Sequence, residues 1–115
     1  MARAFKVRSA ERDAKTDSER LGSISAAIEA AVASIRSERN ALRARVEAAR
    51  DQAAFATGTD YDEYLTRDAK DAAIIKEYEQ QMASGEKRTQ ELERQLAGLG
   101  AIQDVFGRYF AEKLR

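Results

Sequence analysis

The sequence contains no cysteine, no histidine, no proline and no tryptophan. Without cysteine the chain has no disulfide, no thiol nucleophile and no thiolate metal site. Without histidine it lacks the commonest metal ligand and the commonest general base. These absences argue against catalysis, and we expect a protein that is not an enzyme and that holds no cofactor and no metal.

Long hydrophobic runs and an excess of charge are also missing. No apolar run approaches the roughly 20 residues that cross a bilayer, and the N-terminus lacks the apolar core of a secretory signal. A cytoplasmic location is therefore the expectation. The 20 acidic and 20 basic residues cancel, which argues against a dedicated nucleic-acid binder, because such proteins carry a basic excess. Abundant alanine and arginine suggest a bacterial source.

The residues that are present favour helices. The 115 residues suffice for one domain, and alanine and charged residues dominate it. This bias is typical of long helices and coiled coils. Aromatic residues make up only 7% of the chain, so burial is expected along a narrow seam rather than in a thick core.

One interruption divides the helical pattern, at Gly58. Glycine enters the left-handed conformation without strain and commonly ends a helix. We therefore predict an all-α fold, a long antiparallel helical hairpin in which two helices form a coiled coil. The predicted segments are an N-terminal arm over 1–15, a helix over 16–57 capped by Thr16, a turn over 58–60, a second helix over 61–98, and over 101–114 either its continuation or a short third helix after a break at Gly98-Leu99-Gly100.

Apolar residues recur at three- and four-residue steps on both predicted helices, as one face of a helix requires. Glu38 falls where an apolar residue is due, so the pattern predicts a local stutter in the heptad there. The first helix carries Leu21, Ile24, Ile28, Ala31, Ile35, Leu42, Val46, Ala49 and Ala53. The second helix carries Tyr61, Leu65, Ala72, Ile75, Tyr78, Met82, Leu92, Leu96, Leu99, Ile102, Phe106, Phe110 and Leu114.

Charge offers a test of the hairpin. A chain that folds back at Gly58 places residues of opposite sign across from one another. Each exposed pair contributes only about 0.2–1 kcal/mol, but such pairs select register and orientation. The expected pairs are Asp51–Arg67, Arg50–Asp68, Glu47–Lys70, Arg45–Asp71, Arg39–Glu79 and Glu29–Arg88.

The C-terminal segment is the first candidate site. If the first helix begins near Thr16, its partner runs out near Gly100, and the most apolar and aromatic stretch of the chain lies beyond. Contiguous exposed apolar surface usually marks an interface. Either Phe5 and Val7 cover this segment, or it is an oligomer interface or a docking helix. Its candidate residues are Ile102, Val105, Phe106, Tyr109, Phe110 and Leu114.

The hairpin tip is the second candidate site. Phe55, Tyr61 and Tyr64 cluster there and either contact a partner, since tyrosine is favoured in interfaces, or plug the open end of the seam. The nearby Asp60-x-Asp62 resembles the start of a calcium loop, but Asp71 stands where such a loop needs glutamate, so calcium binding is not expected.

A two-helix hairpin leaves one face of each helix exposed to solvent, and the many alanines of the first helix bury little area. Pairing of two hairpins into a four-helix bundle would add burial; alternatively, the alanines only serve helix propensity. The predicted function is a non-catalytic coiled coil that self-associates, with a dimer favoured, and docks a protein partner. The alternatives are a nucleic-acid-associated coiled coil that uses Arg36, Arg39, Arg43, Arg45 and Arg50, and a chaperone or a stalk-like protein of a secretion or export system.

Overall fold

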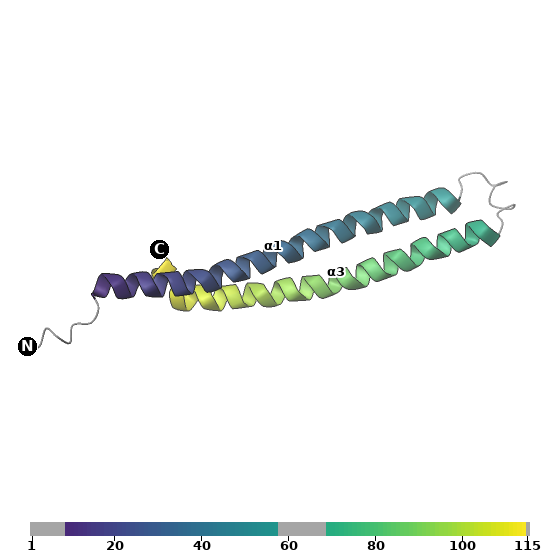
Figure 1. Cartoon of the computed structure of the whole chain (residues 1–115). Coiled ribbons are helices and arrows are strands. Elements are labelled where there is room, and N and C mark those ends of the chain that lie inside the picture. The colour runs from purple at the N-terminus through teal and green to yellow at the C-terminus, as the bar shows by residue number, and fades with distance from the viewer. Residues whose placement is uncertain (1–8, 58–68, 115) are drawn as a thin grey trace, which may run out of the picture. The chain divides into compact units, whose positions relative to one another are not determined.

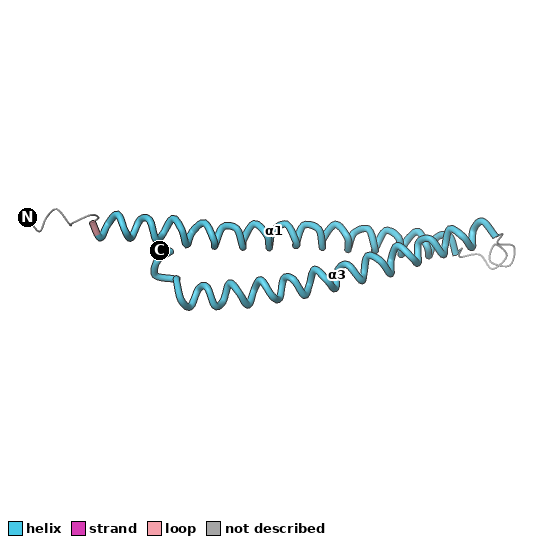
Figure 2. The backbone as a smooth tube through the Cα atoms, turned by 60° about the horizontal axis from the view of Figure 1, so that its bottom comes forward, coloured by secondary structure: helices cyan, strands magenta, loops and turns pink. Residues whose placement is uncertain are grey.

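The computed structural model describes residues 9–57 and 69–114, and every element in these ranges is helical (Figure 1). Helix α1 spans Ala10–Thr57, helix α3 spans Ala69–Phe110, and a 3-10 turn, η2, spans Ala111–Leu114. The all-α class and the two long helices are thus confirmed (Figure 2). Across these ranges no helix is long and apolar enough to cross a membrane.

Helix α1 begins earlier than predicted, because Ser9 caps it. The Ser9 hydroxyl accepts a hydrogen bond from the backbone N–H of Arg12 at 3.1 Å, and the Ser9 carbonyl accepts one from the N–H of Asp13 at 3.1 Å. Serine at this position satisfies one of the free N–H groups of a first turn. The predicted start at Thr16 is wrong, since the first turns are charged and carry no apolar periodicity that would reveal them.

The sequence left open whether the second helix breaks at Gly98 and Gly100, and α3 continues through both residues to Phe110. A glycine inside a helix costs about 1 kcal/mol relative to alanine. Leu96 and Leu99 are both half-buried here, so packing of this stretch offsets that cost. The predicted turn and the predicted start of the second helix lie outside the described residues.

The chain divides into two compact units, each containing part of both long helices. Unit 1 comprises Met1–Ser34 and Leu96–Arg115, and unit 2 comprises Ile35–Gln95. Within unit 2 the two helices are antiparallel, because Arg50 of α1 reaches Glu86 of α3 while Arg43, earlier in α1, reaches Glu93, later in α3. Unit 2 is therefore a helical hairpin.

The register of this hairpin differs from the predicted one. Arg39 contacts Glu93 rather than Glu79, and Arg88 contacts Glu38 rather than Glu29. Each partner lies roughly two to four helical turns away from the expected one. The prediction counted from Gly58, whereas the helices themselves are separated by residues 58–68. The other expected pairs involve side chains outside the described residues.

The buried and half-buried positions of α1 form an uninterrupted heptad, with a and d of the repeat abcdefg facing α3. The predicted stutter is absent. Ser25 and Arg39 occupy a positions of the seam, whereas Ile24, a predicted seam residue, lies at a g position and is exposed. The a and d residues of α1 are Ser18, Leu21, Ser25, Ile28, Val32, Ile35, Arg39, Leu42, Val46, Ala49, Ala53 and Ala56.

Helix α3 follows the same repeat from Ile75 to Phe110. The seam holds between Met82 and Leu92, where the apolar pattern of the sequence has a gap. Gly85 is buried there at a d position, and the Thr89 hydroxyl donates a 2.8 Å hydrogen bond to the Gly85 carbonyl. The a and d residues are Ile75, Tyr78, Met82, Gly85, Thr89, Leu92, Leu96, Leu99, Gln103, Phe106 and Phe110. Among the large side chains of the described residues, only Leu92 is fully buried, at 1% exposure.

Gly85 also allows a close approach of the two helices of unit 2. A Cβ atom at this position would lie 2.5 Å from the Cγ2 atom of Val46. This is shorter than any ordinary contact between carbon atoms. The absence of a side chain at Gly85 is therefore part of the packing against α1.

Candidate functional site

The last turns of α3 carry an open apolar groove of about 360 Å3. All of its lining residues belong to α3, so no residue of α1 contributes to it. They include five of the six residues predicted for the C-terminal site, and the sixth, Leu114, has its side chain outside the described part. The lining residues are Ala101, Ile102, Val105, Phe106, Tyr109 and Phe110.

Most of this groove is exposed to water. Tyr109 is 76% exposed and Ile102 is 52% exposed, and Val105 and Phe110 are also exposed. The ring of Phe110 lies 5.1 Å from that of Phe106 and 6.3 Å from that of Tyr109, both in tilted arrangements. These distances lie in the favourable range for aromatic pairs. The rings therefore order one another on the surface without being covered.

The C-terminal segment was expected to extend past the N-terminal end of α1, with no partner helix beside it. This expectation is wrong. Within unit 1, Leu21 of α1 lines a second groove of about 320 Å3 together with Tyr109 and Phe110 of α3. Asp17 and Arg20 complete its lining. The earlier start of α1 and the shifted register bring the two helices alongside each other here. The segment is nevertheless exposed, because the cover reaches only one side of it.

Ile24 is an apolar surface residue, although its spacing predicted a place in the seam. It is 46% exposed and stands at a g position, next to the seam rather than in it. The sequence does contain the information that assigns Ile24 to the surface. Counting the heptad from Leu42, Val46 and Ala49 back toward the N-terminus places Ile24 at a g position.

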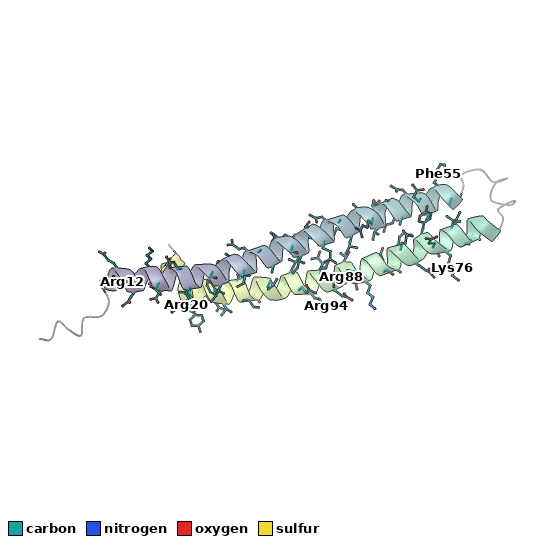
Figure 3. The ribbon with its side chains drawn as sticks, in the orientation of Figure 1. Arg12, Arg20, Phe55, Lys76, Arg88 and Arg94 are labelled. Carbon is teal, nitrogen blue, oxygen red and sulfur yellow. The ribbon has the colours of Figure 1, made fainter. Side chains whose placement is uncertain are left out.

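At the hairpin tip only Phe55 lies within the described residues. Its side chain is 85% exposed and projects from α1 away from α3 (Figure 3). Phe55 therefore does not plug the seam of unit 2. Tyr61, Tyr64 and the aspartates Asp60 and Asp62 lie outside the described residues.

The arginines of α1 largely face acidic residues of α3. Glu93 accepts hydrogen bonds from Arg43 at 2.8 Å and from Arg39 at 3.4 Å, and Arg50 bonds Glu47 at 2.7 Å and approaches Glu86 at 3.5 Å. These ion pairs involve three of the five arginines that were candidates for nucleic-acid binding. They are mostly exposed and act chiefly on register.

On the other flank of unit 2, Arg88 lies between the helices and forms a two-pronged pair with Glu38 (Figure 3). Its Nε–H donates to Glu38 at 2.8 Å and its second amino group donates at 3.3 Å. This hydrogen bonding lowers the pKa of Glu38 and, together with a bond to Glu91, raises the pKa of Arg88. Both groups therefore stay charged at neutral pH.

Among residues 9–57 and 69–114, no three acidic side chains gather into a metal site. Comparison with protein-family models, with curated proteins and with solved structures finds no match to this chain.

Proposed function

We propose that this chain is a non-catalytic coiled-coil scaffold that acts by self-association and by docking a protein partner, and that two hairpins associate into a four-helix bundle. The observation that carries the proposal is the apolar surface of unit 1, where Ile24, Ile102, Val105, Tyr109 and Phe110 are all exposed. Monomeric soluble proteins rarely leave contiguous apolar surface of this kind in water.

The modest burial within one chain also supports association. Only Val32, Ala49 and Leu92 are buried apolar side chains among the described residues. At about 25 cal/mol per Å2 of apolar area, a seam of half-buried residues contributes little. A second hairpin laid against the exposed face supplies the missing burial, as in four-helix bundles.

The test is the mass of the full chain in solution, measured by light scattering over a range of protein concentrations. We expect a dimer that dissociates on dilution. Deletion of residues 101–115 removes most of the apolar surface and should leave a monomer. A full chain that is monomeric at every concentration would remove self-association from the proposal.

The partner-docking part of the proposal is supported by Phe55, since a large exposed aromatic side chain is typical of an interface anchor. Replacement of Phe55 by serine should leave the mass and the helicity unchanged and should abolish binding of any partner that docks at the tip. An effect on mass would instead place Phe55 in the self-association interface.

The nucleic-acid alternative is the weaker one, because Arg39, Arg43 and Arg50 are paired with glutamates. It predicts an affinity for DNA that falls steeply with salt. The chaperone alternative predicts that the full chain suppresses aggregation of an unfolded client and that the chain without residues 101–115 does not.

A further inference from the structure

The apolar stripe of the heptad is wider in unit 1 than in unit 2. In unit 2 most apolar residues of both helices occupy a and d, with Ile74 at g and Phe55 at c as exceptions, and the flanking e and g positions carry the charged pairs Arg43–Glu93 and Glu38–Arg88. In unit 1 apolar residues occupy g as well as d, beside the apolar a residues Val32, Leu96 and Phe110. The apolar d and g residues of unit 1 are Leu21, Ile24, Ile28 and Ala31 on α1 and Leu99, Ile102, Phe106 and Tyr109 on α3.

The a positions of unit 1 are mixed. Ser18 and Ser25 on α1 and Gln103 on α3 are polar, whereas Val32, Leu96 and Phe110 are apolar, and Val32 is buried. The hairpin nevertheless turns the a and d positions of α1 toward α3, so that Ser25 is half-buried while Ile24 is 46% exposed. The pairing within one chain therefore leaves the apolar g residues of unit 1 in water.

A stripe at a and d alone is typical of a two-stranded coiled coil, whereas an apolar stripe that extends to e or g is typical of helices in larger bundles. Unit 2 has the first pattern and unit 1 has the second. The apolar g residues Ile24 and Ala31 precede Ile35 on α1, and Ile102 and Tyr109 follow Leu99 on α3, so all four belong to unit 1.

The g positions of the two helices lie on the same flank of unit 1. Asp17 and Tyr109 are g residues of α1 and α3, and they line one groove. In unit 2 the same relation joins the g residues Glu38 and Arg88 at 2.8 Å. Ile24 of α1 therefore faces the same side as Ile102 and Tyr109 of α3.

We propose that this flank is the surface on which a second copy of the chain docks with its own identical flank, and that the resulting four-helix packing is confined to unit 1. We call the surface the g flank and define it by Ile24, Ile102, Val105 and Tyr109. The inference rests on the self-association proposed above and specifies its surface and its extent.

Self-complementarity favours a second copy as the occupant. The four residues of the g flank are uncharged, so its partner must be apolar there, and a two-fold dimer places the same patch on both sides. These four side chains leave on the order of 400 Å2 of apolar surface in water. Neighbouring alanines, leucines and aromatic rings can extend this toward the roughly 800 Å2 per partner of a standard interface.

A lipid surface fits this flank less well. Amphipathic helices that bind membranes are rich in lysine and arginine on their polar face. Over residues 10–34 and 96–112 seven acidic side chains stand against four basic ones, and unit 1 as a whole, with nine basic and seven acidic residues, has no strong basic excess. Unit 2 is excluded from the bundle for a related reason, because a second copy docked there would have to bury the charged pairs of its e and g positions.

The first experiment uses charged substitutions at matched positions. Ile24→Glu and Ile102→Glu place a carboxylate on the g flank, whereas Ala26→Glu and Ala97→Glu place one at exposed b positions of the same helices. All four positions are exposed in the hairpin, so circular dichroism should show unchanged helicity. By sedimentation equilibrium we expect the g-flank variants to raise the dimer Kd at least 100-fold and the b-position variants to leave it within about threefold.

The second experiment exploits the absence of cysteine from the chain. Ala27→Cys lies beside the g flank, Ala30→Cys lies on the outer face of the same helix, and Gln52→Cys occupies a g position of unit 2. A short bis-maleimide should join two chains through position 27. It should join neither position 30 nor position 52 at the same protein concentration.

The outcomes separate this inference from the broader proposal. A dimer that is insensitive to Ile24→Glu and Ile102→Glu, or that cross-links as readily at Ala30 or Gln52 as at Ala27, overturns the g-flank interface and leaves self-association intact. A full chain that is monomeric at all concentrations overturns both. Binding of the chain to anionic vesicles, lost in Ile102→Glu, would replace the second copy with a lipid surface.

Discussion

Replacing Gly85 by alanine should destabilise the hairpin, although alanine is the better helix former. Gly85 is buried at a d position of α3, and an added methyl group would lie 2.5 Å from Cγ2 of Val46. Valine is β-branched and holds essentially one side-chain rotamer in a helix. Rotation of Val46 away from the methyl group would therefore cost energy, and without it the two helices of unit 2 must separate to admit the methyl group.

Two opposing contributions set the magnitude. Alanine in place of glycine in a helix interior stabilises by about 0.5–1 kcal/mol. Overpacking a fitted seam costs about 1–3 kcal/mol. The net expectation for Gly85→Ala is a loss of about 1 kcal/mol in the free energy of unfolding. Gly98→Ala is the matched control on the same helix. A Cβ there meets no atom within 4 Å, so this variant should gain about 0.5–1 kcal/mol.

The assay is urea unfolding followed by far-UV circular dichroism, at one protein concentration because association adds to apparent stability. A double-mutant cycle identifies the cause: in a Val46→Ala background the clash is gone, and Gly85→Ala should become stabilising, like Gly98→Ala. If Gly85→Ala stabilises the unmodified chain as much as Gly98→Ala does, the helices do not approach closely at this point and the register that places Gly85 against Val46 is refuted.

Three further predictions concern the start of α1, its polar seam position and its ion pair with α3. Ser9→Ala should cost about 1 kcal/mol of local stability and speed amide hydrogen exchange in the first turn of α1. Ser23→Ala, in the helix interior, should leave the exchange rate of that first turn unchanged. Arg39→Leu should raise the free energy of unfolding by about 1 kcal/mol, since its glutamate partner keeps a second arginine; a lower value contradicts the seam position. The hydrogen bond from Arg88 holds the pKa of Glu38 below its ordinary value of 4.5, so the pair stabilises the fold above that value and the stability is lost as the pH falls through the lowered pKa. Urea midpoints compared at about pH 7 and pH 3 should therefore differ less in Arg88→Gln than in the unmodified chain.

Much of the fold was predictable because helical periodicity is local. Apolar residues at three- and four-residue steps, with no proline to interrupt them, predict both long helices, and Gly58 predicts the end of α1 at Thr57. The start of α1 was missed because Ser9 acts through hydrogen bonds in a turn without apolar residues. Local propensity left open whether the helix breaks at Gly98 and Gly100, and α3 continues through both residues, where Leu96 and Leu99 are half-buried.

The candidate site was predicted in part. The aromatic stretch around Phe106 and Tyr109 stands out in composition alone, and the exposed groove lies there. Ile24 was assigned to the seam instead, because a and g are adjacent positions and apolar residues recur at g in that region; only the heptad phase of Leu42, Val46 and Ala49 distinguishes the two. Whether the a residues or the g residues of α1 face inward depends on the position of the partner helix rather than on α1 itself.

The sequence by itself determined that this protein is helical, that its helices carry a heptad, and that cysteine and histidine chemistry are absent. The register was decided only by the tertiary structure, since it depends on contacts such as Arg43 with Glu93, 50 residues apart in the chain. The tertiary structure also decided which face of unit 1 is left in water. Periodicity is a property of neighbouring residues, whereas burial of one stripe and exposure of another follow from where a second helix lies.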